Sequence, residues 1–197
     1  MKKLLYATGN KYKIESMKKR LKGLDIEIIS PKDLNISVNI IEDGKTVIEN
    51  AIIKAKAYYD IAKIPTIAGD TALYVKKFKK QPGLYVHRVN GKDLTPEETQ
   101  EYYINSLKEV GGESEANYNT GLAIIKDDKI YTTEIKEDMF ILTSKVSDNP
   151  CKYDTLSRIQ YEPNLKKYIC ELTDEDIKNR NSTFDRECVK FIKSIID

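Results

Sequence analysis

Three segments in the amino-terminal part of the chain carry side chains that could act on a magnesium-bound polyphosphate. One is the glycine turn Thr8–Lys13, which is rich in amide and ammonium groups. Another is Glu42, which lies ahead of a helical segment with Asn50 and Lys54 along one edge. The third is Asp70, which follows an apolar run. If these segments meet in space, they form a candidate site for phosphate chemistry.

The chemistry follows from the residue types. Mg²⁺ usually takes one or two protein carboxylates and completes its octahedron with water and phosphate oxygens. Lysines neutralise charge that develops on the phosphoryl and leaving groups. A carboxylate beside the metal can also orient or deprotonate the attacking water. The alternative is that neither carboxylate binds a metal, because Glu42 is simply an acid at a helix start and Asp70 a turn residue.

The glycine turn is a candidate phosphate cradle. It follows the apolar strand segment Leu4–Ala7 and opens a helical pattern. Such a corner exposes backbone N–H groups and the positive end of the helix dipole, so it attracts anions. We predict that Thr8, Gly9, Asn10 and Lys13 bind phosphate. The alternative is a plain strand–turn–helix corner, with Asn10 as the N-cap and Lys13 in solvent, because such corners are common in open α/β folds.

The elements that must position these residues follow from local patterns. Asn10–Leu21 is expected to be a helix and Asp25–Ser30 a strand. Thr46 caps a helix that runs to Ala62, whose small apolar residues would let it lie close to a sheet. Ile64–Val75 is expected to be a strand–loop–strand with Asp70 in the turn.

The rest of the chain adds helices and antiparallel strands. The segments 116–125 and 130–135 predict a hairpin, and 139–142 a further strand. Thr95–Glu98 is a capping box that starts a helix to about Val110. One last helix is expected from Thr173, with Phe184 and Cys188 on its apolar side. The sum predicts an α/β fold with one mixed sheet and helices on its faces, as a single domain over residues 1–197.

Composition excludes several classes of function. The 33 basic and 31 acidic residues nearly cancel, which argues against a nucleic-acid partner. The three cysteines form no metal-binding or disulfide pattern and indicate reduced thiols. No signal-peptide core and no apolar run of about 20 residues is present, so we expect no membrane partner and a cytoplasmic location.

Four blocks of sequence occur in an order and spacing that are together far more specific than any one block. They are Ala7-Thr8-Gly9-Asn10-x-x-Lys13, Glu42-x-Gly44-x-Thr46-x-x-x-Asn50-Ala51-x-x-Lys54-Ala55, Asp70-Thr71-x-Leu73 and Pro82-Gly83-x-Tyr85-x-x-Arg88. Over residues 4 to 90 the chain resembles the inosine triphosphate pyrophosphatase family, whose members are noncanonical purine nucleoside triphosphate pyrophosphatases. A weaker match continues through the segment 116–125, Tyr153-Asp154 and the segment 171–173.

This resemblance implies a Mg²⁺-dependent hydrolase that cleaves between the α- and β-phosphates of ITP, dITP or XTP. It also implies an elongated two-lobed α/β fold and a homodimer. Residues are assigned by the motif positions that they occupy. Lys54 would contact phosphate and Thr71 the substrate. Glu42 and Asp70 would bind the metal, with Asp70 also the base for the water. Tyr153 and Asp154 keep two positions of the loop that contacts the nucleotide base.

Apart from one missing carboxylate, the departures from the family pattern fall on the residues that contact the base. The family's acidic pair has Gly69 as its first member here, and its Phe-Gly-Tyr-Asp loop reads Cys151-Lys152-Tyr153-Asp154. A family Lys aligns with Ile177, and a family Ser-His-Arg aligns with residues 181–183, Asn-Ser-Thr. A pocket that hydrogen-bonds a 6-keto group rejects bases that lack this group, because the polar groups of the pocket would stay unpaired. This chain lacks the family residues that make those bonds, so we expect altered or relaxed base choice.

Two questions stay open at this point. Tyr153, Lys152, Arg180 and Arg158 are unranked candidates for base contacts. The competing hypothesis is a nucleotide-binding protein of the same fold with reduced or lost hydrolysis, suggested by Gly69 and the altered loop.

Overall fold

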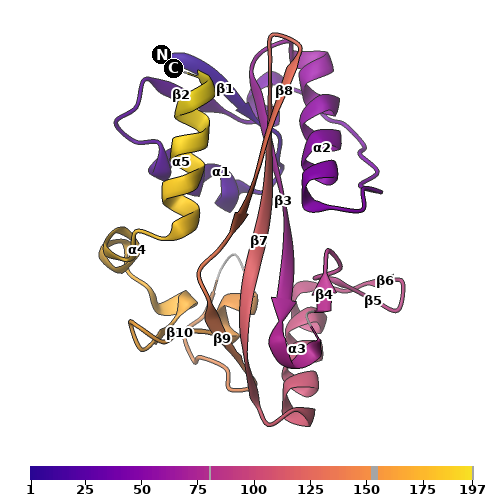
Figure 1. Ribbon diagram of the computed structural model, residues 1–197, viewed down its shortest axis with the longest axis vertical. Coiled ribbons are helices and arrows are strands. Elements are labelled where there is room, and N and C mark those ends of the chain that lie inside the picture. Colours follow the sequence, from indigo (N-terminus) through magenta and orange to yellow (C-terminus); the bar gives the residue numbers. More distant parts are fainter. Residues whose placement is uncertain (80, 152–154, 197) are drawn as a thin grey trace. The chain divides into compact units, whose positions relative to one another are not determined.

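The computed structural model describes residues 1–79, 81–151 and 155–196. Its contacts divide the chain into two compact units. The first comprises Met1–Thr71, Asn119–Lys136 and Thr183–Asp197, and the second Ala72–Tyr118 and Glu137–Ser182. The mixed sheet with flanking helices confirms the expected α/β class (Figure 1). A single domain over 1–197 stays a prediction. In the described part of the chain, no helix is long and apolar enough to cross a membrane.

The first unit is a mixed sheet with helices on both faces. Its strands are β1 (Lys2–Tyr6), β2 (Ile26–Ile29) and parts of β3 (Thr66–Val75) and β7 (Glu113–Lys126), with β8 (Lys129–Lys136). β1 pairs in parallel with β2 on one side and β3 on the other, and β7 forms an antiparallel hairpin with β8. Its helices are α1 (Lys11–Arg20), α2 (Val47–Ala62) and α5 (Thr183–Ile196), and a 3₁₀ turn covers Pro31–Leu34.

Strand alternation assigns the two faces to different helices. Side chains two apart on a strand share a face. Tyr6, Ile67 and Leu122 pack in one cluster with the buried sides of α1 and α5. Their neighbours Ala7, Ala68 and Ala123 pack in another cluster with Ala51, Ala55 and Tyr59 of α2. Figure 1 shows α2 on one side of the strands, with α1 and α5 on the other.

α2 lies close to the sheet because small residues meet along the contact. The expected close approach through small apolar residues is confirmed, since Ala51 and Ala55 are both fully buried. The closest approach is at Gly121 of β7. A Cβ atom built there would lie 2.6 Å from the carbonyl carbon of Val47 and 2.8 Å from the backbone nitrogen of Ile48. Only glycine lets the first turn of α2 sit on this strand.

The far end of α2 is attached to the β7–β8 hairpin. The two-residue turn Asp127-Asp128 has φ angles of 51° and 58°, the left-handed pair of a type I′ turn. The Asp128 backbone N–H donates to the Tyr59 hydroxyl at 3.0 Å. The predicted hairpin is therefore confirmed, and its turn is anchored to the helix.

The second unit has its own core around one helix. Its elements are α3 (Pro96–Glu109), α4 (Asp174–Arg180), β4 (Gln81–Gly83), β5 (Arg88–Val89), β6 (Lys92–Asp93), β9 (Phe140–Thr143), β10 (Gln160–Glu162) and β11 (Lys167–Tyr168), with 3₁₀ turns at Lys76–Phe78, Thr155–Ile159 and Ile169–Glu171. Thr95 and Glu98 form the expected capping box of α3. Tyr103 and Leu107 of α3 are buried with Leu73, Phe140 and Leu142.

Two sequence-based expectations are wrong. Residues 64–75 do not form a strand–loop–strand, because β3 runs unbroken through Gly69, Asp70 and Thr71. A Cβ atom at Gly69 would lie 3.0 Å from Leu122 Cδ2 on the neighbouring strand β7, which is a tight contact. The last helix is two helices, because Asn181 takes a left-handed conformation (φ 42°) that ends α4 before α5 begins at Thr183.

Gly121→Ala is expected to lower the free energy of unfolding by about 1–3 kcal/mol, the usual range for overpacking. The added methyl group would overlap backbone atoms of α2, which cannot rotate away. Chemical denaturation followed by circular dichroism measures the change. Gly9→Ala is the control, because a methyl group there meets no atom within 4 Å. Its effect should stay within about 0.5 kcal/mol. Equal stability of the Gly121→Ala variant and the wild type would contradict this close approach.

Candidate functional site

Three of the predicted site residues meet at one ammonium group. Lys54 Nζ lies 2.8 Å from Glu42 Oε2 and 3.6 Å from Asp70 Oδ1. The same nitrogen donates to the Gly69 carbonyl oxygen at 3.2 Å. The Lys54 and Asp70 side chains are only 16% and 19% exposed, and that of Glu42 is 39% exposed. Residues from three separate segments therefore form one charged cluster within the first unit.

The helix and strand that carry this cluster explain why it forms. Asp70 lies two residues after Ala68, so it shares the sheet face that α2 covers. Asn50 and Lys54 are one turn apart on α2 and lie over that face. Asn50 Nδ2 donates to Asp70 Oδ2 at 3.0 Å, which leaves Oδ1 toward Lys54. The polar edge predicted for this helix is the edge that contacts Asp70.

The predicted phosphate cradle lies at the carboxyl end of β1. Asn10 is the N-cap of α1, and its Oδ1 accepts from the backbone nitrogens of Tyr12 at 2.9 Å and Lys13 at 3.2 Å. Thr8 Oγ1 accepts from the Asn10 backbone nitrogen at 3.2 Å. Gly9 is exposed and borders open space. The Asn10 cap fits both alternatives, and the open glycine allows a ligand to approach.

The parallel register brings this cradle toward the charged cluster. Tyr6 pairs with Ile67, and the Ala7 backbone nitrogen donates to the Ile67 carbonyl oxygen at 2.8 Å. Continuing the chain past Ala7 therefore leads toward the level of Gly69 and Asp70. Ligands of open α/β sheets bind in this position, beyond the carboxyl ends of the strands where neighbouring connections diverge.

Thr71 lies on the opposite face of β3 from Asp70. Its hydroxyl is 2.9 Å from that of the buried Thr120 on β7. A substrate contact by Thr71 stays a prediction. The predicted nucleotide contacts Tyr153 and Asp154 fall outside the described residues.

The other candidates for base contacts have partners within the second unit. Arg158 donates to the Ser147 carbonyl oxygen from Nε at 3.0 Å and from Nη2 at 2.7 Å. Arg180 Nε lies 3.0 Å from a carboxylate oxygen of Glu162, whose side chain is 3% exposed. Lys152 falls outside the described residues. Base contacts by Arg158 or Arg180 would therefore compete with protein partners.

The donor set of the cluster fits a magnesium ion that is shared with phosphate. Glu42 and Asp70 both contact the ammonium of Lys54, so each carboxylate already faces a positive charge. Among the described residues there is no group of three or more His, Cys, Asp or Glu that could hold a metal ion. Two carboxylates are a typical protein contribution to Mg²⁺ that is otherwise bound by water and phosphate oxygens.

Tyr6 belongs to the core rather than to the cradle that follows it. Burial raises its pKa to about 12, with Cys188 adding to the rise and Arg20 opposing it. Its hydroxyl therefore remains neutral near physiological pH.

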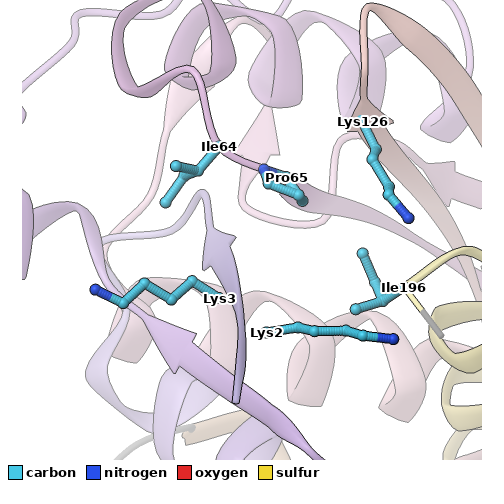
Figure 2. A pocket seen from close by; sticks show the side chains of 6 residues that line it. All are labelled: Lys2, Lys3, Ile64, Pro65, Lys126 and Ile196. Atoms are coloured by element: carbon cyan, nitrogen blue, oxygen red, sulfur yellow. The ribbon is translucent and has the colours of Figure 1, made fainter.

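A basic pocket lies at the other end of β1. It has a volume of about 280 Å³ and is lined by Lys2, Lys3, Ile64, Pro65, Lys126 and Ile196. Figure 2 shows Lys2 and Lys126 extending toward Ile196, whereas Lys3 extends the other way. Lys126 Nζ donates to the Ile195 carbonyl oxygen at 2.7 Å. This lysine therefore interacts with the carboxyl end of α5, where cations are stabilised by the helix dipole.

Sequence reasoning does not predict one contact of the candidate site. Asn50 was predicted only as part of a polar helix edge, yet its amide joins Asp70 to the backbone nitrogen of Gly44. The sequence contains one signal for this contact. Asn50 lies one turn after the Thr46 cap and next to the apolar residues Val47 and Ala51, where a polar side chain needs a hydrogen-bond partner.

Comparison with known proteins finds relatives along nearly the whole chain. The model of the Ham1 family matches residues 4–193. A dITP/XTP pyrophosphatase of Thermoanaerobacter pseudethanolicus is 35% identical over 181 residues, which cover 91% of this chain and 89% of that protein. One from Leptospira interrogans is 30% identical over 198 residues, 98% of each chain. A HAM1 protein from Coxiella burnetii has a similar fold, with a TM-score of 0.78 at 22% identity over 98% of this chain and 99% of that one.

Lys54→Met should lower the free energy of unfolding by about 1–2 kcal/mol in metal-free buffer, because two carboxylates lose their shared cation. Mg²⁺ should then raise the melting temperature of this variant more than that of the wild type. Thermal unfolding with EDTA and with MgCl₂ measures both effects. Lys56→Met is the control, since Lys56 pairs with the exposed Asp60 on the same helix. A Lys54→Met variant that matches the wild type in both buffers would refute the proposed charge balance.

Proposed function

This chain belongs to the Ham1 family, and from that membership and the Glu42–Lys54–Asp70 cluster we propose that it is a nucleoside triphosphate pyrophosphohydrolase. It would hydrolyse a nucleoside triphosphate to a nucleoside monophosphate and pyrophosphate. The family resemblance inferred from the four sequence blocks is confirmed. The observation that carries the proposal is the meeting of two carboxylates and a lysine in the unit that also contains the predicted phosphate cradle.

The amino-terminal cradle would bind the phosphates. Its helix N-terminus offers backbone N–H groups and a positive dipole end. Lys13, exposed in the first turn of α1, would add an ammonium group. Lys54 would add a second when a divalent cation takes over its place between the carboxylates.

Glu42 and Asp70 would hold Mg²⁺. When bound, this ion supplies positive charge that neutralises the phosphate oxygens. Asp70 would also accept a proton from the attacking water. Asn50 donates to Oδ2 of Asp70, so Oδ1 is the oxygen that faces the charged cluster.

Base choice is proposed to be relaxed or altered relative to the family pattern. At the positions where the family has Lys and Ser-His-Arg, this chain has Ile177, whose side chain is 46% exposed, and Asn-Ser-Thr at 181–183. A pocket discriminates strongly only when its buried polar groups would otherwise stay unpaired. These replacements would remove such groups for a 6-keto base.

Two further proposals rest on the resemblance and the composition alone. The chain would form a homodimer, as family members typically do. It would act in the cytoplasm, as its scattered cysteines suggest.

Asp70→Asn should reduce pyrophosphate release by about 100-fold or more, the range for loss of a general base. Nucleotide binding should stay largely intact, because the cradle is untouched. Stopped assays of pyrophosphate and nucleotide-induced thermal stabilisation measure the two properties. Turnover that survives the substitution would show that Asp70 is not the base. A wild-type protein that is stabilised by nucleotide but releases no pyrophosphate would instead support the binding-protein hypothesis.

A substrate panel tests base choice. With Mg²⁺ and ITP, XTP, dUTP or the standard nucleoside triphosphates, we expect pyrophosphate release with weak preference among bases. The measurement is kcat/KM for each nucleotide. Strong selectivity for ITP over ATP would contradict the argument from the replaced base contacts.

A further inference from the structure

We propose that Asn50 is a positioning residue. Its amide links Asp70 to the loop that carries Glu42, so that both carboxylates can bind one divalent cation. This inference rests on the metal site of the proposed function. Asn50 touches neither the phosphate cradle nor the Lys54 ammonium in any contact described above. Its effect on the site passes through its two hydrogen-bonded neighbours.

The orientation of the Asn50 amide follows from its partners. Oδ1 accepts from the Gly44 backbone nitrogen at 2.9 Å, and Nδ2 donates to Asp70 Oδ2 at 3.0 Å. A backbone N–H only donates and an ionised carboxylate only accepts. Rotating the amide by half a turn would set donor against donor and acceptor against acceptor. The two partners therefore allow one orientation, and that orientation links the loop to β3.

Burial makes this link costly to break. Asn50 is 6% exposed, and a buried amide without partners loses its hydration without compensation. Gly44 shows how closely the loop approaches. A Cβ atom at Gly44 would lie 2.6 Å from Asn50 Oδ1, so only glycine allows the backbone to reach the amide.

The same loop is held to the first turn of α2 at two more points. The Lys45 backbone nitrogen donates to Glu49 Oε2 at 2.5 Å, and Thr46 Oγ1 accepts from the Glu49 backbone nitrogen at 3.1 Å. Glu42 lies only two residues before Gly44. Fixing Gly44 therefore limits where the Glu42 carboxylate can go, while the other end of the Asn50 amide fixes Asp70.

Outer contacts of this kind set the geometry of metal ligands. Their loss typically lowers metal affinity or activity by about 10- to 100-fold. The carboxylate of Asp70 has two oxygens, and Asn50 occupies one of them. The other oxygen then faces the place shared with Glu42, which is now taken by the Lys54 ammonium.

The test separates the two ends of the amide. Asn50→Asp keeps an acceptor for Gly44 but sets a negative charge against Asp70. Gly44→Ala keeps the Asn50 side chain but displaces the loop. Binding of Mn²⁺ is measured by electron paramagnetic resonance, with an ITP analogue that carries a methylene group between the α- and β-phosphorus. We expect both variants to bind Mn²⁺ about 10-fold or more weakly than the wild type.

Two controls guard against indirect effects. Asn90→Asp adds the same charge in an exposed turn of the second unit and should bind Mn²⁺ as the wild type does. Glu49→Ala loosens the loop at Lys45 without touching Asp70, and its loss of affinity should be smaller than that of Asn50→Asp. Analogue binding in EDTA should be unchanged in Asn50→Asp, since the cradle does not contact Asn50. Melting temperatures show whether each variant is folded.

The outcomes are decisive. Wild-type Mn²⁺ affinity in folded Asn50→Asp would overturn the inference, whatever the activity of the wild type. If Asn50→Asp does not fold, the Gly44→Ala affinity decides in the same way. A wild type that binds Mn²⁺ but releases no pyrophosphate would refute the proposed function. The Mn²⁺ affinities of the variants would then still decide whether Asn50 positions Asp70. A wild type that binds no Mn²⁺ would refute both.

Discussion

The contact of the first turn of α2 with β7 at Gly121 is the constraint on which the candidate site depends. Interiors are close-packed, so the spacing between a helix and a sheet is set by the residues at their nearest point. Here that point is a glycine facing the backbone of Val47 and Ile48. Asn50 and Lys54 lie one and two turns further along the same helix. Their side chains can contact Asp70 on β3 because the first turn of α2 lies so close to the sheet.

Charge compensation then shapes what this proximity can do. Two neighbouring carboxylates would repel one another without a cation between them. The Lys54 ammonium pairs with both carboxylates and also donates a hydrogen bond to the Gly69 carbonyl oxygen. The cluster therefore carries its own cation. A divalent ion would have to displace that ammonium, and the freed lysine would then be available to the phosphates that bring the ion in.

Local signals in the sequence predict most of the helices and the main hairpin, but not the continuity of every element or the contacts between elements. The helix from Val47 to Ala62 was predicted correctly because Thr46 caps it and the spacing of its apolar residues is helical. The continuity of β3 through Asp70 was missed, because it depends on pairing with β7, which is far along the chain. The break at Asn181 was also missed, since one residue in a left-handed conformation gives little signal in advance. The two hydrogen bonds of the Asn50 amide cannot be predicted from local sequence either, because its partner Asp70 lies 20 residues away in sequence.

The alternation of β3 has a consequence for the Asp70 carboxylate. Gly69, Asp70 and Thr71 are consecutive, yet only the middle residue faces α2. Losing or gaining a single residue between Thr66 and Asp70 would leave the strand paired but turn its carboxylate toward α1 and α5. The number of residues between Thr66 and Asp70 therefore decides which face of the sheet carries the Asp70 carboxylate, and with it whether that carboxylate can meet Asn50 and Lys54.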